Sequence, residues 1–452
     1  MRKLPVLTYT LLIAVLISCS SQTKLLKQAS GSSATISDDS LLSLVQYKTL
    51  QYFTDGAEPV SGMARERYHV DGDYPENDMN VITSGGSGFG VMALIVGIER
   101  GFITREKGLE QLTRIVGFLE KADRFHGAYS HWLWGETGKA KPFSAKDNGA
   151  DIVETAYLMQ GLITVREYLK NGSMAEQELA NRIDKIWRDV DWYLFTKNGT
   201  EKVLFWHWSP DYGWEMNQKV QGYNECLITY ILAASSPTHP VDTAVYHQGW
   251  ARHGTIVSKA EKYGHKLILR YDGAEEYGGP LFWAHYSYLG LNPSKISDRY
   301  AAYFELNRNL TLINWQWCTE NPLRHAGYSD SCWGLTAGYS PIGYAAHAPG
   351  KNDLGVITPT AALSSFPYTP EQSMNALKYF YFTLGDRIFG KYGFYDGFHQ
   401  GMNWYPQRYL AIDQGPVVIM IENYRTSLLW DLFMGAPEIR NGLKRLGFTV
   451  SE

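Results

Sequence analysis

A chain of 452 residues is long enough to bury a large core, and its formal net charge is -4, from 42 Lys and Arg against 46 Asp and Glu. Without a basic excess the chain lacks the electrostatic field that a nucleic-acid binder needs. Hydrophobic residues make up 44% of the chain and charged residues 19%, so we expect a compact globule. The 31 Tyr and 14 Trp supply flat apolar faces with a polar edge, which suit sugar rings, although many of them will fill the core.

Residues 1–19 have the features of a bacterial lipoprotein signal peptide. Arg2 and Lys3 form a short basic region, an apolar run follows, and the sequence Leu-Ile-Ser-Cys ends at Cys19. Because the apolar run is too short to span a bilayer, we expect cleavage before Cys19 and anchoring by acyl chains on that residue. Residues 20–38, rich in Ser, Thr, Gln and Lys, predict a flexible tether. The protein is therefore expected in the periplasm or on the outer-membrane surface, with lipid as its only membrane contact.

Helical periodicity dominates residues 39–452, which we interpret as one domain because no Pro-, Gly- or Ser-rich linker divides it. No fixed-period repeat is visible, which disfavours a solenoid. Helical hairpins closed into a ring remain the economical packing, so we predict an all-α fold, an (α/α)6 toroid with a small β insertion. Apolar residues recur at helical spacing in eleven segments: 39–53, 87–99, 104–121, 150–169, 176–195, 222–234, 241–252, 297–317, 370–389, 419–433 and 437–446. Two segments, 202–210 and 265–273, have the β-branched and aromatic character of strands.

A first acidic segment, "DNGADIVETAYLMQG" at 147–161, has two interpretations. Asp151 and Glu154 stand three apart on one helix face and match a capping box, in which Asp151 accepts from a helix amide and Glu154 reaches back. The same carboxylates, with Asp147, are equally placed to act on a substrate. Taken alone, the segment does not decide between a helix cap and a functional site.

Two further helix starts carry acids. Glu225 lies in "VQGYNECLITYIL", and Asp413 opens "DQGPVVIMIENYRT". The helix macrodipole favours acids at these positions in any case. In a ring of hairpins, however, the same ends of alternate helices converge on one mouth, where separate acids face each other. Such a pair provides what glycosidic cleavage requires: a protonated carboxyl for the leaving oxygen and a carboxylate that activates water or attacks the sugar.

Aromatic and polar residues in the Gly-rich loops near these acids are typical of saccharide subsites. His207 and His285 stand in no metal-ligand spacing, so we predict no metal site; the loop acids Asp71, Asp73 and Asp78 fit solvated turns as well as a calcium ion. At most one pair among Cys226, Cys318 and Cys332 could form a disulfide, and buried free thiols explain them equally well. The residues that we predict to bind substrate are Asp147, Trp208, Trp214, Glu215, Asn217, Tyr223, Asn224, Trp283, His285, Tyr328, Asp330, Trp333, Trp404 and Arg425.

Four segments, "GWEMNQKVQGYNE", "YGGPLFWAHYS", "DSCWGLTAGYSP" and "DQGPVVIMIENYRT", resemble the glycoamylase-like domain grouped with glycoside hydrolase family 144. The resemblance covers roughly residues 210–435. Relatives often carry the name glucoamylase, whereas characterised members are endo-β-1,2-glucanases. The resemblance implies an (α/α)6 fold, no organic cofactor and inverting acid/base hydrolysis. It also points to Asp151, Glu154, Glu225 and Asp413 as the functional acids.

The sequence thus predicts a monomeric glycoside hydrolase that acts on a glucan, with endo-β-1,2-glucanase as the leading activity. We expect Glu225 to donate the proton and Asp413 to act as the base. Asp151 and Glu154 would bind sugar hydroxyls or relay a proton through water. Two alternatives stay open: an exo-acting glucoamylase-like α-glucosidase, and a non-catalytic surface lipoprotein that binds glycan.

Overall fold

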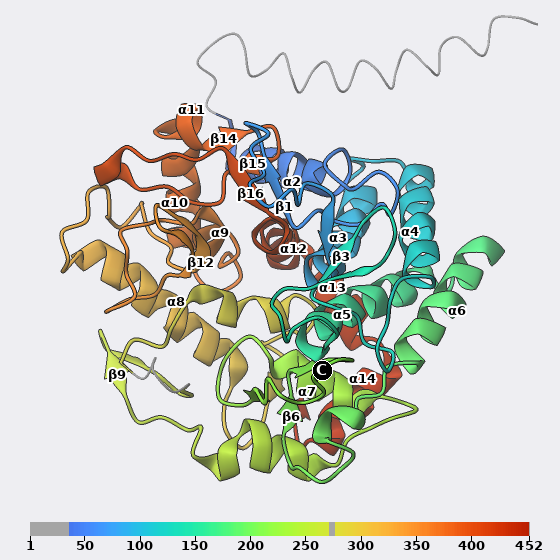
Figure 1. The fold of residues 1–452 in the computed structure, drawn as a ribbon. Coiled ribbons are helices and arrows are strands. Elements are labelled where there is room, and N and C mark those ends of the chain that lie inside the picture. The colour runs from blue at the N-terminus through green and yellow to red at the C-terminus, as the bar shows by residue number, and fades with distance from the viewer. Residues whose placement is uncertain (1–35, 271–275, 452) are drawn as a thin grey trace, which may run out of the picture. The chain divides into compact units, whose positions relative to one another are not determined.

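The computed structural model of the chain describes residues 36–270 and 276–451 (Figure 1). By its internal contacts the chain divides into two compact units, Met1–Ser43 and Leu44–Glu452. The predicted signal peptide, its Cys19 and nearly all of the predicted tether lie outside the described residues. No helix within the described ranges combines the length and apolar character needed to cross a membrane.

The second unit is mostly helical, in agreement with the predicted class. Most of the predicted helical segments contain a helix whose ends differ by a few residues from the expected ones. The helices are α2 (Asp38–Phe53), α3 (Ser84–Glu99), α4 (Arg105–Leu119), α5 (Ile152–Leu169), α6 (Met174–Arg188), α7 (Leu227–Ser235), α8 (Tyr303–Glu320), α9 (Pro359–Leu363), α10 (Pro370–Phe382), α11 (Gly385–Ile388), α12 (Ala411–Thr426), α13 (Leu428–Met434) and α14 (Pro437–Arg445).

Three predicted helices differ from the structure. Residues 241–252 form only a short π-helix, Val245–Trp250. The predicted helix 370–389 is broken into α10 and α11. Helix α12 begins at Ala411, well before the expected start at 419, and includes Pro416. A Gly-Pro pair usually breaks a helix, but here burial of nearly the whole of α12 outweighs the hydrogen bond that proline cannot donate.

The strands are short and lie in loops between the helices. The expectation of one small sheet at 202–210 and 265–273 is wrong, because those segments pair with different partners; residues 271–273 lie outside the described ranges. Eight small sheets form within the described residues: β1 (Arg67–His69) with β16 (Arg408–Leu410), β9 (Glu261–Lys262) with β10 (His265–Lys266), β11 (Ile296–Ser297) with β17 (Thr449–Val450), β12 (Ala337–Ser340) with β13 (Gly343–Ala346), β14 (Phe389–Gly390) with β15 (Gly393–Phe394), β2 (Val81–Thr83) with β3 (Trp132–Trp134) and β4 (Ala140–Lys141), β5 (Ala150–Asp151) with β7 (His207–Trp208), and β6 (Leu204–Phe205) with β8 (Lys219–Val220).

The helices form an inner and an outer set. Helices α3, α5, α7 and α12 are buried on nearly every face, whereas α4, α6 and α14 bury only one stripe. A helix that is apolar all round belongs inside a large core, and an amphipathic one at its surface. Accordingly α4, α6 and α14 pack behind α3, α5 and α7, and in Figure 1 α12 is seen end-on near the middle with α4 and α6 at the periphery.

The Gly-rich start of α3 allows the closest helix contact of this inner set. A Cβ on Gly88 would lie 2.2 Å from the Tyr157 carbonyl oxygen, and one on Gly161 would lie 2.1 Å from the Gly88 carbonyl oxygen. Only glycine therefore permits α3 and α5 to approach backbone to backbone. Because α5 begins at Ile152 and α12 packs against α3, this contact places the starts of α3, α5 and α12 side by side.

Candidate active site

Asp151 is both a helix cap and part of a charged cluster. Its Oδ1 accepts hydrogen bonds from the amides of Val153 and Glu154, both at 2.9 Å, which confirms the predicted cap at the start of α5. Its Oδ2 lies 3.3 Å from Nδ1 of His131. The cap interpretation is therefore confirmed for this residue, and its second oxygen faces a neighbouring ionisable side chain.

Glu154 does not close the predicted capping box. Its Oε2 instead accepts a hydrogen bond of 3.0 Å from the amide of Gly85, in the first turn of α3. Glu154 is buried, and burial together with the negative charge of Asp151 raises its pKa to about 8, although the nearby charge of His131 opposes the rise. This carboxyl is therefore protonated at neutral pH and available as a proton donor.

Asp147 and His207 complete this first cluster. His207 Nε2 lies 3.4 Å from Asp147 Oδ2 and 3.8 Å from Asp151 Oδ2, because β7 pairs with β5 and sets His207 opposite Asp151. Burial lowers the pKa of His207, and burial followed by the charge of Asp151 raises that of Asp147. The cluster thus contains one neutral imidazole and a carboxyl that resists ionisation.

His131 determines which carboxyl of this cluster is ionised. Burial acts against its charge, but Glu154 and Asp151 more than compensate and raise the pKa of His131 to about 10. Burial likewise acts against the charge of Asp151, yet the hydrogen bond from His131 and the charges of His207 and His131 bring its pKa below the ordinary value. Asp151 is consequently the first of the three carboxyls to ionise, whereas Asp147 and Glu154 hold their protons to higher pH. Neighbouring carboxyls with pKa values pushed apart are what acid/base catalysis requires.

Glu225 lies two residues before α7 and is half-buried. Its backbone carbonyl accepts hydrogen bonds from the hydroxyls of Ser287 and Tyr157. Burial is the main cause that raises the pKa of Glu225 to about 7, and the charge of Asp151 adds to it. A carboxyl with a pKa near neutrality and access to solvent is suited to general acid catalysis.

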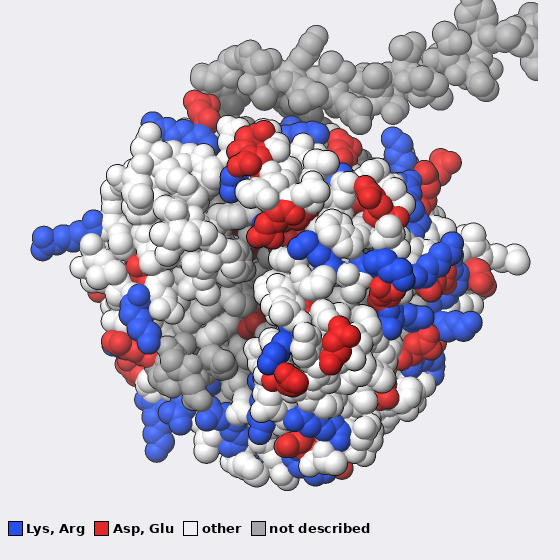
Figure 2. Space-filling view, in the orientation of Figure 1, with Lys and Arg blue, Asp and Glu red and all other residues white. Residues whose placement is uncertain are grey.

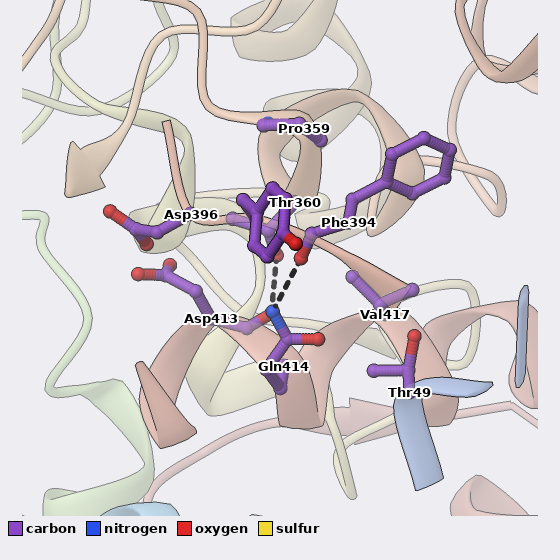
Figure 3. A pocket seen from close by; sticks show the side chains of 9 residues that line it. Thr49, Pro359, Thr360, Phe394, Asp396, Asp413, Gln414 and Val417 are labelled. Carbon is purple, nitrogen blue, oxygen red and sulfur yellow. Dashed lines mark hydrogen bonds between the residues drawn. The ribbon is translucent and has the colours of Figure 1, made fainter. Parts of the chain in front are cut away.

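Asp413 lies in the first turn of α12 rather than ahead of the helix, as the expected start at 419 implied, and it is buried. Its carbonyl oxygen accepts a hydrogen bond of 2.7 Å from Thr360 Oγ1, and the next residue, Gln414, donates to the carbonyl of Phe394 (Figure 3). Burial and the charge of Asp396 raise the pKa of Asp413 well above its ordinary value. These contacts fix the start of α12 against α9 and β15.

Tyr286 is a buried residue whose ring packs against α5 and α3, the helices that begin near the acids. Its ring lies 5.7 Å from that of Tyr157 on α5 and 5.3 Å from that of Phe89 on α3. Burial raises the pKa of the Tyr286 hydroxyl, and the charges of Asp413, Glu154 and Glu225 are among the further causes. The charges of Glu225 and Asp413 thus both reach the same buried phenol.

Figure 2 shows a hollow on one face of the molecule. It lies between the parts that are coloured orange and those that are coloured green in Figure 1. Tyr344, on the β12–β13 hairpin, is 58% exposed as a whole, yet desolvation of its hydroxyl is the main cause that raises its pKa, followed by the charges of Asp413, Asp396, Glu66 and Glu154. A solvent-exposed side chain close to acids from several elements indicates a concave, wet site. Tyr344 is thus placed to contact a ligand that reaches the acids.

The structure gives contacts for each of the other residues predicted to bind substrate except Arg425, which is described below. Trp208 follows His207 on β7 and pairs with Ala150, and Asn224 precedes Glu225 and accepts from the Cys226 amide. Among the remaining residues, Trp214 packs its ring on Phe195 and Phe205, Trp283 packs on Tyr223, and Glu215 forms an ion pair with Lys146. The half-buried Trp404 forms backbone hydrogen bonds with His399. The others form side-chain hydrogen bonds: Asn217 with Lys197, Tyr223 with Asn307, His285 with Ser365, Tyr328 with Asp353, Asp330 with Ser331, and Trp333 with the carbonyl of Gln372.

Arg425 is separated from the acids by the length of α12. It stands twelve residues after Asp413, which is about 18 Å at 1.5 Å per residue, and its Nη1 donates to Gln46 Oε1 at 2.8 Å. Near it Glu422 accepts from Arg100 at 2.7 and 3.0 Å. The structure therefore places Arg425 in a polar group at the other end of α12.

One group of metal-ligand type occurs among the described residues. The ligand atoms of His131, Asp147 and Asp151 lie within 4.8 Å of one another. In this structure, however, His131 Nδ1 lies 3.3 Å from Asp151 Oδ2 and the other oxygen of Asp151 caps α5, so hydrogen bonds already engage two of the three residues. Cys226, Cys318 and Cys332 are buried free thiols.

Sequence patterns missed four residues at the site: Glu66, His131, Tyr344 and Asp396. None lies at a helix start or within the motifs that single out the other acids. Glu66 precedes β1, and its carbonyl accepts from the amide of Ala411, two residues before Asp413. This proximity arises from the pairing of β1 with β16, across more than 300 residues, which no local pattern reveals.

Comparison with known proteins identifies the family. A family model described as "Putative glucoamylase" matches residues 217–437. The structure is similar to an endo-β-1,2-glucanase from Chitinophaga pinensis in complex with sophorotriose and glucose, with 62% identity, a TM-score of 0.91 and coverage of 92% of this chain and 99% of that one. An endo-β-1,2-glucanase from Talaromyces funiculosus, 11% identical, shares the fold with a TM-score of 0.66 over 91% of each chain.

A third relative is longer than this chain. An exo β-1,2-glucooligosaccharide sophorohydrolase from Parabacteroides distasonis is 42% identical over 436 residues, which are 92% of this chain and 59% of that protein. This chain therefore spans less than two thirds of that relative. With the near-complete coverage of the Chitinophaga enzyme, these matches confirm that the chain belongs to the glycoamylase-like family grouped with glycoside hydrolase family 144.

Proposed function

We propose that the protein is a glycoside hydrolase that cleaves β-1,2-glucan, and that it cuts within the chain. The observation that carries the proposal is the 62% identity to an endo-β-1,2-glucanase over 92% of this chain. The relatives named for their activity act on β-1,2-linked glucans, which does not favour α-glucan hydrolysis or glycan binding without catalysis.

In the proposed reaction Glu225 protonates the leaving glycosidic oxygen and Asp413 accepts a proton from the attacking water, with inversion at the anomeric carbon. The half-buried position of Glu225 and its pKa of about 7 support the role of donor. The anionic Asp151 and the protonated Glu154 bind sugar hydroxyls or relay protons through water.

The proposal extends to architecture and location. The inner and outer helix sets support an (α/α)6 toroid, with the starts of inner helices around the hollow. The sequence of residues 1–19 supports a lipid anchor at Cys19, in the periplasm or on the outer-membrane surface. The protein is proposed to act as a monomer.

A second candidate is exo-acting release of sophorose, which the 42% identity to the Parabacteroides enzyme supports. Purified protein incubated with linear β-1,2-glucan separates the two: an endo enzyme yields a ladder of oligosaccharides early in the reaction, whereas the exo enzyme yields only the disaccharide. Maltodextrin serves as the control substrate. Failure to form new reducing ends from β-1,2-glucan would reject both candidates.

The catalytic assignment is tested by Glu225→Gln and Asp413→Asn. Each variant is expected to lose roughly 10²- to 10⁴-fold in kcat, the usual contribution of a general acid or base. Thermal melting should stay near that of the wild type, because both amides keep the size of the side chain they replace. Full activity in either variant would contradict the role given to that residue.

A further inference from the structure

Asp396 forms a carboxyl pair with Asp413 that the sequence motifs do not predict. Asp396 follows β15, whereas Asp413 belongs to α12, and both are 2% exposed. The two line one small cavity together with Thr49 and Thr360, among others. Figure 3 shows their carboxyl groups side by side and extended in the same direction.

Three of the four oxygens of this pair lack a hydrogen bond. Asp396 Oδ2 accepts from the amide of Tyr339, but Asp396 Oδ1 and both oxygens of Asp413 have no partner among the residues that the structure describes. Two ionised carboxylates in this position would repel each other without solvent to screen them, and each unpaired oxygen would cost free energy. A proton placed between the carboxyls removes the repulsion and gives two of the three oxygens a hydrogen-bond partner.

The groups that face the pair do not neutralise it. Acidic and phenolic side chains surround it: Glu66 beside β1, Tyr286 after the turn 281–284, Tyr339 on β12 and Tyr344 on β13. Two arginines on the adjoining strands pair with other acids: Arg67 lies 3.3 Å from Asp78, and Arg408 lies 3.7 Å from Asp73 and 3.9 Å from Asp71.

We propose that Asp396 and Asp413 share one proton, so that the pair keeps one negative charge with which Asp413 can accept the proton of the attacking water, and that Asp396 is a positioning residue. The assignment rests on the proposed hydrolysis. Burial is the main cause that raises the pKa of both carboxyls, which agrees with a pair that is not doubly ionised at neutral pH. Titration of such a pair belongs to both residues together.

The proton balance of a turnover follows. The bond between the anomeric carbon and the leaving oxygen breaks, and Glu225 protonates that oxygen. Water supplies the hydroxyl that bonds to the anomeric carbon, and its proton goes to Asp413, so the pair holds two protons. One proton then returns through solvent to Glu225, and the pair again holds one.

Two substitutions of Asp396 test the inference. In Asp396→Ala nothing hydrogen-bonds the Asp413 carboxylate, so we expect kcat to fall on the order of 10²-fold and the acidic limb of the pH–kcat profile to move up by about one pH unit or more. In Asp396→Asn an amide N–H replaces the shared proton and the amide oxygen still accepts from Tyr339. This variant should recover most of the lost activity and the wild-type acidic limb.

A purely structural role of Asp396 would not move the acidic limb of the pH–kcat profile. Asp353→Asn is the control. Asp353 is also a buried carboxyl, but it lies outside the pair and accepts hydrogen bonds from Trp317 and Tyr328. The inference is overturned if Asp396→Asn, folded, is as inactive as Asp396→Ala, or if both keep the wild-type profile.

Infrared spectroscopy separates this inference from the proposed function. Glu154 and other buried acids also contribute protonated-carboxyl stretches, so difference spectra are needed: at neutral pH wild type minus Asp396→Asn should show such a band, whereas wild type minus Asp353→Asn should not. If β-1,2-glucan is not cleaved but this band behaves as expected, the proposed function fails and the shared proton stands. If the band is unchanged in Asp396→Asn, the shared proton is refuted whatever the activity.

Discussion

At the scale of single residues, one imidazole decides the protonation of a whole cluster. His131 stands 3.3 Å from Asp151, and its charge stabilises one anion beside two carboxyls that ionise at higher pH. Asp151, Glu154, Glu225 and Asp413 could be selected from the sequence because acids at helix starts form a visible pattern. His131 and Asp396 could not, since their significance lies in a partner that is distant along the chain.

We expect His131→Gln to lower the free energy of unfolding by about 1.5–3 kcal/mol, the usual loss for a hydrogen bond to a charged group. The pKa of His131 is raised on folding from 6.5 to about 10, so its contribution is complete below pH 6.5 and declines as pH rises towards 10. Denaturant unfolding at several pH values measures the difference from wild type. His239→Gln, at an exposed site, is the control, and a difference that grows above pH 8 would contradict the ion pair.

At the scale of elements, the contact between α3 and α5 positions the acids at their starts. The Gly-rich segment predicts such an approach in general terms, but which helix lies opposite is fixed only by tertiary packing. Helix α12 shows the limit of local patterns more clearly. Its Gly-Pro pair indicates a break, and only its buried neighbours explain why the helix continues through Pro416.

Gly88→Ala tests the contact between α3 and α5. The new methyl would meet the Tyr157 carbonyl at 2.2 Å, so the helices must separate, and we expect a loss of about 1–3 kcal/mol in the free energy of unfolding. Because α5 carries Asp151 and Glu154 at its start, kcat should fall as well. Gly385→Ala is the matched control, since its nearest neighbour, the Phe380 carbonyl oxygen, is 3.9 Å away. Unchanged stability in Gly88→Ala would contradict the packing.

At the scale of the whole molecule, the buried acids make stability depend on pH. Burial raises the pKa of Glu154 from 4.5 to about 8, so between these values the folded state holds a proton that the unfolded state has released. Stability must therefore fall as pH rises through this range. Glu225, with its pKa raised to about 7, acts in the same direction.

Glu154→Gln should flatten this dependence by up to about 1.4 kcal/mol per pH unit. The side-chain amide introduced by this substitution retains an acceptor for the Gly85 amide but has no proton to release. The free energy of unfolding, measured by denaturant titration from pH 4.5 to 8, checks the slope. Equal slopes in wild type and variant would mean that Glu154 ionises normally in the folded protein.

The pairing of distant strands has a consequence for any attempt to shorten the protein. The stretch 217–437 that matches the family model contains Glu225, Asp396 and Asp413, but Glu66, His131, Asp151 and Glu154 all precede it. A fragment limited to that stretch would keep the carboxyls of Glu225, Asp396 and Asp413 but lose those of Glu66, Asp151 and Glu154. Helix α12 would also lose its packing against α3. Recombining separately expressed halves, rather than trimming, is the route by which a divided form could regain a complete set of acids.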